Sequence, residues 1–435
     1  MAIDYLQTPL RLEVQQQHAN LCNTCVIVPA PLVSIVYQQV LKAQQASVQA
    51  PGFRKGTVPL EYIAQNFKAS LVEHLKEFLF NYFVINFLHQ ELRAQKYLIA
   101  GEPRLENIVA NPEGEARFTF QVNTLPTIPL AEWKYLPFKA PKRKKYKDLD
   151  RQVETFVKDE LTSLEAHKHD HAQINDWVNF DICLVDNDHQ PIVQNYQENL
   201  WLKLGDEEAD KPLRALFLDK TIGTTFYTQS REIQNYFSNQ IDTNYIFAIT
   251  ITDILHHNFF CLDQFKRYFK LKNSKDVYQK LIEVFSYRND LSLRRSIAEE
   301  SLKLLTLKHR FEVPSYLILR QQSKVLDAVQ NNPDYHVYRM QKDFTRRVQQ
   351  LAEKQIREML MLDQISYNEN IDISNLDVKH YLNLIKRPRT KEFIYFDPPI
   401  SKLKGQEMLF TAQELKQACL REKTLNHMIF HLTKA

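Results

Sequence analysis

Glycine is unusually scarce in this sequence, with 7 glycines among 435 residues, whereas an average protein contains about 7%. Phosphate-binding loops need glycines so that backbone N–H groups can approach a phosphate closely. Neither G-x-x-x-x-G-K-[ST] nor G-x-G-x-x-G occurs in the chain. The sequence therefore argues against a nucleotide enzyme built on either motif, and we expect no cofactor.

Cysteine is also rare. The five cysteines are an odd number, and only Cys22 and Cys25 lie close together. This usage argues against a disulfide framework and favours a reducing cytoplasm. The C-x-x-C spacing and the alternating histidines of residues 167–171 both permit a metal or redox site, but neither is joined by a second ligand motif. We expect no bound metal.

Long apolar runs are missing. The most apolar stretch, 78–88, has 11 residues and is interrupted by two asparagines, whereas a membrane helix needs about 18. The first residues carry Asp4 and Arg11 where a signal peptide needs an apolar core. We therefore expect no membrane segment and a cytoplasmic location.

What remains is the composition of a folded globular protein. Hydrophobic residues make up 44% of the chain and charged residues 25%. The net charge, 56 − 52 = +4, is too small for a protein held to nucleic acid along its whole surface, although local basic patches remain open. The length suggests about three domains.

The first region, up to about residue 140, mixes strands and helices. Residues 116–122 alternate apolar and polar side chains, and a β-branched run occupies 26–28, as in half-buried strands. Helical spacing of apolar residues occurs at 32–41 and 71–83. A proline cluster and the basic run 142–147 then indicate a linker beside a domain boundary.

The rest of the chain divides once more. The β-rich runs 177–185 and 245–251 are expected to be neighbouring strands of one sheet. From residue 256, helical apolar stripes dominate, for example over 344–360. We predict an α+β multidomain protein with a mixed α/β domain at 1–140, a sheet-and-helix domain at 141–255 and an all-α domain at 256–435.

One loop between two predicted helices carries the strongest functional signal. It consists of Gly52, Phe53, Arg54, Lys55 and Gly56. Phenylalanine offers apolar contact, arginine and lysine reach phosphates and acidic groups, and the glycines permit a tight turn. The alternative is an ordinary solvent-exposed basic turn. The loop resembles the signature loop of bacterial trigger factor, a chaperone that docks on the ribosome, except that Thr57 replaces the usual lysine.

Three further segments resemble the same family in the same order. Residues 116–122 are similar to its returning strand, 247–249 to the last strand of its isomerase domain, and 311–318 to its V-P-x-x-L-I element. The resemblance implies a ribosome-binding N-terminal domain, an FKBP-like prolyl isomerase domain and a helical substrate-binding domain, in agreement with the three regions above.

The middle domain departs most from the family pattern. Asp181 matches the family's strand aspartate, and Tyr236 corresponds to the tyrosine on the far side of the pocket. However, Ile182 stands where the family has an aromatic residue, and Asp-Lys-Pro-Leu at 210–213 replaces the aromatic turn. We expect charged residues at the pocket mouth to admit water and isomerase activity to be weak or absent, unless rings such as Trp201 rebuild the pocket.

The resemblance implies an ATP-independent chaperone. It would dock near the peptide exit of the large ribosomal subunit, on ribosomal protein and rRNA, and keep nascent polypeptides open for folding or export. It leaves a homodimer off the ribosome open. The rival hypotheses are an active peptidyl-prolyl isomerase and an rRNA-binding assembly protein without clients.

Overall fold

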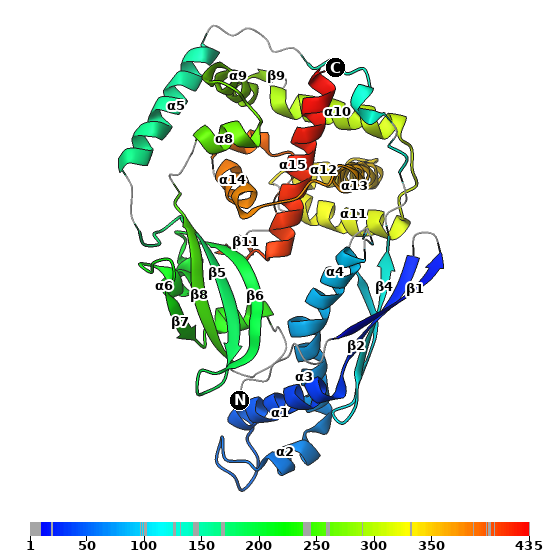
Figure 1. The fold of residues 1–435 in the computed structure, drawn as a ribbon, viewed down its shortest axis with the longest axis vertical. Helices are drawn as coiled ribbons and strands as arrows, with labels where there is room; N and C mark the ends of the chain where they lie inside the picture. The colour runs from blue at the N-terminus through cyan, green and yellow to red at the C-terminus, as the bar shows by residue number, and fades with distance from the viewer. Residues whose placement is uncertain are drawn as a thin grey trace. The chain divides into compact units, whose positions relative to one another are not determined.

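The chain folds as an α+β multidomain protein in the computed structural model (Figure 1). The structure describes residues 10–18, 21–95, 97, 99, 102–124, 128–130, 132–141, 148–166, 170–237, 245–257, 262–288, 290–330, 333–385, 387–396, 398, 402–403 and 405–434. The basic run 142–147, together with His167 and His169, lies outside these residues. No helix in the described ranges has the length and apolarity that a membrane span requires.

Two compact units divide the chain, and each is interrupted in sequence. The first comprises Met1–Leu125, His171–Ile254 and Lys402–Leu409. The second comprises Pro126–Asp170, Leu255–Ser401 and Phe410–Ala435. The division into three domains at residues 140 and 255 stays a prediction.

The first sheet of unit 1 has four antiparallel strands in the order β1-β2-β4-β3. Strand β4 alternates buried and more exposed residues along its length, as its sequence pattern predicts. The strands are β1 (Arg11–His18), β2 (Leu21–Val28), β3 (Arg104–Ala110) and β4 (Ala116–Asn123).

Helices connect β2 to β3. Proline occupies the first turn of α1, where its missing N–H is not needed by the helix. Helices α3 and α4 are joined by one π-helical turn, Phe80–Val84, and bury Leu71, Leu75 and Phe78 among others. The helices are α1 (Ala30–Ser47), α2 (Leu60–Asn66), α3 (Lys68–Leu79) and α4 (Ile85–Ala94).

The second sheet of unit 1 has the order β6-β5-β8-β7. Strands β5 and β8 are neighbours, which confirms the expectation for the two β-rich runs. The elements are β5 (Trp177–Val185), β6 (Pro191–Lys203), a 3₁₀ turn (Glu208–Asp210), α6 (Lys211–Phe217), β7 (Thr225–Thr228), α7 (Arg231–Phe237) and β8 (Ile246–Leu255). One continuous apolar core includes residues of both sheets of this unit.

Unit 2 is mainly helical. Helix α9 begins where the Asn273 side chain accepts the Asp276 N–H, and α10 begins where Ser292 accepts the Arg295 N–H. The helices are α5 (Leu149–Ala166), α8 (Leu262–Tyr268), α9 (Ser274–Phe285), α10 (Leu293–Lys308), α11 (Ser315–Gln330), α12 (Tyr335–Arg339), α13 (Phe344–Asn368), α14 (Asn375–Ile385) and α15 (Ala412–Lys434).

Short elements interrupt the helical region. They are the 3₁₀ turns Trp133–Tyr135 and Thr390–Phe393, and two hairpins of two-residue strands: β9 (Tyr287–Arg288) with β10 (Leu291–Ser292), and β11 (Lys402–Leu403) with β12 (Gln406–Glu407). The second hairpin belongs to unit 1, although the segments before and after it belong to unit 2.

A buried histidine–tyrosine pair joins the two halves of unit 1. His74 of α3 is 3% exposed, and its Nε2 lies 2.6 Å from the hydroxyl of Tyr245, just before β8. Burial lowers the pKa of His74 to about 4. A neutral imidazole therefore occupies this contact at pH 7.

This pair predicts a loss of stability in mild acid. The folded-state pKa of His74 lies below the ordinary value of about 6.5, so the unfolded chain binds more protons between these two pH values. The free energy of unfolding should fall by about 3 kcal/mol as the pH drops from 6.5 to 4. Hydrogen exchange of the α3 amides, corrected for intrinsic rates, measures this loss.

Two variants control the measurement. His74→Gln should flatten the pH dependence of α3 protection because glutamine does not titrate, whereas His336→Gln, at an exposed position, should leave it unchanged. An unaltered pH dependence in His74→Gln would rule out His74 as its source.

Candidate functional site

The loop between α1 and α2 owes its shape to its two glycines. Gly52 and Gly56 have φ values of +86° and +82°, in the left-handed region that side chains disfavour. The Phe53 N–H donates to the Ala50 carbonyl at 3.1 Å, and the Thr57 N–H donates to the Arg54 carbonyl at 3.1 Å. The loop is therefore a pair of linked tight turns.

The base of the loop is fixed to the core. Val58 is fully buried, and its carbonyl accepts a hydrogen bond from Gln45 Nε2 of α1 at 2.6 Å. Thr57, which replaces the family's usual lysine, donates its hydroxyl to the Arg54 carbonyl at 2.9 Å. The substitution loses a charge but adds a bond that closes the second turn.

The tip of the loop presents the three predicted side chains to solvent. Phe53 is 41% exposed, and its ring lies 5.4 Å from that of Tyr62 on α2. Arg54 and Lys55 are exposed, and neither forms an ion pair with a carboxylate of the described residues. An aromatic ring beside two uncompensated cations suits a surface that carries both phosphate and apolar groups.

Of the predicted remnants of an isomerase pocket, Asp181 has a structural role. Asp181 accepts the N–H of Asn199 at 2.7 Å, which holds the irregular register between β5 and β6. Ile182 and Trp201 are buried, so neither side chain is accessible to a proline substrate. Tyr236 lies in α7, and its side chain is outside the described part of the chain.

Asp210 corrects one expectation. The sequence places it at a water-filled pocket mouth, but it is 2% exposed and its Oδ1 accepts the N–H of Glu407 at 2.6 Å. Lys203 Nζ lies 3.5 Å from the Glu407 carboxylate. A β-carbon on Gly205 would lie 1.9 Å from Asp210 Oδ2. The β11–β12 hairpin therefore docks where the sequence suggested solvent.

The cysteine pair is part of the first sheet. Cys22 and Cys25 are free thiols on β2, and positions three apart on a strand point to opposite faces. Burial raises the pKa of both thiols, which opposes the reactive thiolate form. Within the described residues, no three histidine, cysteine or acidic side chains gather as metal ligands.

Exposed apolar side chains also occur on the helical unit, at positions that the sequence did not single out. Helices α11 and α13 pack through a small core of Val325, Val348 and Ala352, yet large apolar side chains on and between these helices face solvent. Leu351, which the helical stripe assigns to the interior, is 42% exposed, and Met340 is 87% exposed. Leu319, Val337 and Tyr338 are other exposed large apolar residues of this segment.

Comparisons with known proteins agree with these features. The family model described as "Bacterial trigger factor protein (TF)" matches residues 11–157. A trigger factor of Rhodopirellula baltica is 23% identical over 394 residues, which cover 86% of this chain and 80% of the relative. A trigger factor of Chlamydia abortus is 21% identical over 437 residues, 95% of each chain.

A solved structure from a study of promiscuous substrate recognition in folding and assembly by the trigger factor chaperone aligns over 97% of this chain and all of its own, with 13% identity and a TM-score of 0.40. The sequence matches confirm the predicted resemblance to trigger factor, which extends over most of the chain at 21–23% identity. The low identity fits a divergent relative of these proteins.

The docking of the β11–β12 hairpin depends on one carboxylate and can be tested. Asp210→Ala leaves the Glu407 N–H without its acceptor at a buried site, so hydrogen exchange at this amide should accelerate about ten- to a hundredfold. Asp210→Asn keeps an acceptor oxygen and should preserve most of the protection. Asp206→Ala, at an exposed position, is the matched control. Equal protection in Asp210→Ala and the wild type would contradict the assignment.

Proposed function

We propose that this chaperone docks on the large ribosomal subunit through loop 52–56 and holds unfolded nascent chains on its helical unit without ATP. The observation that carries the proposal is the loop itself: Phe53, Arg54 and Lys55 project from two linked turns on a buried base. The resemblance to trigger factor supports a ribosomal partner near the peptide exit. Cytoplasmic location follows from that partner.

Client binding is assigned to the apolar surface of α11–α13. Unfolded chains expose apolar segments of varied sequence, and a surface with scattered aliphatic, aromatic and methionine side chains accepts them without fixed register. Unit 2 offers five such residues close together in sequence, from Leu319 to Leu351. Their exposure costs stability in water, which favours a role in contacting clients.

Prolyl isomerase activity is proposed to be weak or absent. The twisted transition state of X-Pro rotation is stabilised in a dry aromatic cup. Here Ile182 is buried in the core, and Asp210, at the position of the aromatic turn, binds the β11–β12 hairpin. These positions serve packing and hairpin docking, so the domain acts as a scaffold.

The loop assignment is tested by ribosome co-sedimentation. Changing Phe53, Arg54 and Lys55 together to alanine should weaken binding at least tenfold, because it removes the apolar contact and both cations. Exposed substitutions usually change stability by no more than about 0.5 kcal/mol, so the variant should stay folded. Wild-type binding should weaken as the salt concentration rises. The slope of log binding constant against log salt concentration should decrease in magnitude by about one for each phosphate-contacting cation removed.

The matched control removes two other exposed cations of unit 1, Arg104 and Lys211, and should sediment with ribosomes as the wild type does. Undiminished sedimentation of the triple variant would disprove the loop assignment. If the triple variant lost both ribosome binding and the ability to hold a free unfolded client, the assignment of these two roles to separate parts of the chain would be wrong.

The client surface is tested by suppression of aggregation. Replacing Leu319, Val337 and Met340 with serine should reduce the holding of an unfolded client several-fold, because each change removes exposed apolar area. Serine at the exposed Val109 and Ile222 of unit 1 is the control and should leave holding unchanged. Full holding by the triple serine variant would place client binding elsewhere.

A further inference from the structure

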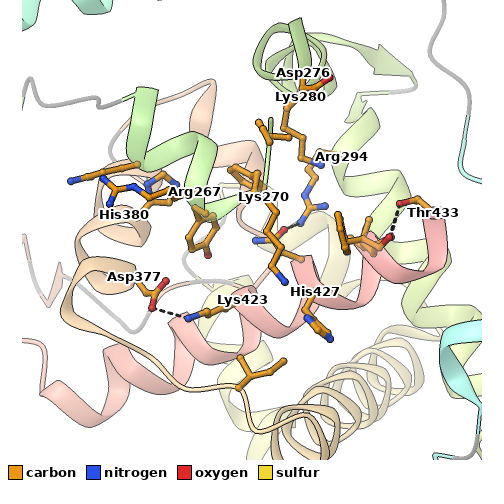
Figure 2. Close-up of a pocket in the computed structure, with 18 of the residues that line it drawn as sticks. Arg267, Lys270, Asp276, Lys280, Arg294, Asp377, His380, Lys423, His427 and Thr433 are labelled. Carbon is orange, nitrogen blue, oxygen red and sulfur yellow. Dashed lines mark hydrogen bonds and ion pairs between the residues drawn. The ribbon is translucent and has the colours of Figure 1, made fainter. Parts of the chain in front are cut away.

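Unit 2 contains a cavity of about 700 Å³, formed by residues of α8, α9, α10, α14 and α15 and the loop after α13. Figure 2 shows Arg294, Lys270 and Lys423 among the side chains around it. A volume of this order is typical of sites for small molecules. None of its lining residues belongs to loop 52–56 or to the exposed apolar residues of α11–α13.

The decisive feature is a buried arginine that is only partly bonded. Arg294 of α10 is 1% exposed, and its Nη2 donates to Asn426 Oδ1 of α15. Its Nε and Nη1 have no hydrogen-bond partner among the described residues, and it forms no ion pair with a described carboxylate. Nε carries one N–H and Nη1 two. A permanently charged group is thus left with unused donors at the cavity wall.

Other polar groups of the lining are also buried without a hydrogen-bond partner within the described ranges. They include the Tyr268 hydroxyl, His380 Nε2 and the acceptor Gln264 Oε1. The Tyr268 and His380 rings lie 4.2 Å apart. Buried donors are nearly always satisfied in folded proteins, so several orphaned groups around one cavity indicate a missing partner.

The carboxylates of the lining do not supply that partner. Glu283 is paired with Lys280 at 2.9 Å, and Asp377 with Lys423 at 2.9 Å. Glu369 is paired with Lys134 at 2.5 Å. Lys270, exposed at the rim, lies over the Phe430 ring and has no carboxylate partner in the described structure. Arg294 and Lys270 therefore lack a carboxylate partner among the described residues, although Asp276 and Asp372 also line the cavity.

We propose that this cavity binds a small organic phosphate, with its phosphate group on Arg294 and its body against the apolar lining. A phosphate monoester is close to a dianion at pH 7 and carries three acceptor oxygens, which suits two cations and several orphaned donors better than a monocarboxylate does. Phe269, Leu271 and Ile371 supply apolar surface for the body.

The burial of Arg294 also selects against polymers. A phosphodiester in a nucleic acid is flanked by chain on both sides, so it cannot enter a cavity deep enough to reach a side chain that is 1% exposed. A terminal phosphate on a small molecule can enter end-on. The ligand is thus distinct from rRNA.

Phenyl phosphate is the probe, titrated calorimetrically into the full-length protein. We expect saturable one-to-one binding, with inorganic phosphate weaker because it lacks the apolar body. Arg294→Gln should weaken phenyl phosphate binding at least about tenfold, the loss expected for a hydrogen-bonded charge. Arg295→Gln, which alters the neighbouring exposed arginine paired with Glu299, should bind as the wild type does.

Lys270→Gln is the second test variant. Lys270 is exposed, so this variant should stay folded even if Arg294→Gln does not. It should weaken phenyl phosphate binding about three- to tenfold. Unchanged binding in Lys270→Gln, or in a folded Arg294→Gln, would overturn the proposal, as would the absence of saturable binding to the wild type.

Two competitors decide the ligand class. Phenylacetate binding more tightly than phenyl phosphate would overturn the phosphate assignment, and displacement of phenyl phosphate by an acidic client peptide would assign the cavity to clients instead. Ribosome binding and client holding should be normal in Arg294→Gln, so a failure of this proposal is distinguishable from a failure of the chaperone function.

Discussion

The apolar core shared by the two sheets of unit 1 is the constraint on which the rest of that unit depends. Residues of α3, such as Leu75 and Phe78, lie in the same core as Phe247 and Ile249 of β8. The rings of Phe78 and Tyr245 meet edge to face at 5.8 Å. Removing the middle sheet would expose this core to water, at a cost of about 25 cal/mol per Å² of apolar area. The middle sheet is therefore needed for packing, whatever its enzymatic activity.

The loop at residues 52–56 is independent of that core except at its base. Its side chains contribute little to folding because they are exposed, whereas Val58 and the Gln45 hydrogen bond fix where the turns begin. The chemistry proposed for the tip is thus separated from stability, so a residue such as Thr57 can vary there without structural cost. In a chain with only 7 glycines, two are used to shape this loop.

Local patterns predicted the local elements well. Alternation predicted β4, β-branched runs predicted β2 and the β5–β8 pair, and a five-residue motif predicted the loop and the family. Features set by tertiary contact were missed. Asp210 looks like a surface residue in sequence, because nothing local reveals that Glu407, 197 positions later, donates to it. Leu351 fits a buried stripe, yet it is 42% exposed.

The burial of Arg294 is the clearest case of a feature that the sequence alone could not reveal. An arginine in the first turn of an amphipathic helix is ordinarily solvated, and only the packing of α10 against α15 makes it 1% exposed. A buried charge without a counter-ion is destabilising, and an apolar residue of similar volume would often be no worse. Its place beside orphaned Tyr268 and His380 groups therefore calls for a compensating anion. Unit 2 thus exposes large apolar side chains on α11–α13 and buries the charged Arg294. Both features are the reverse of the usual distribution, and packing alone does not explain them.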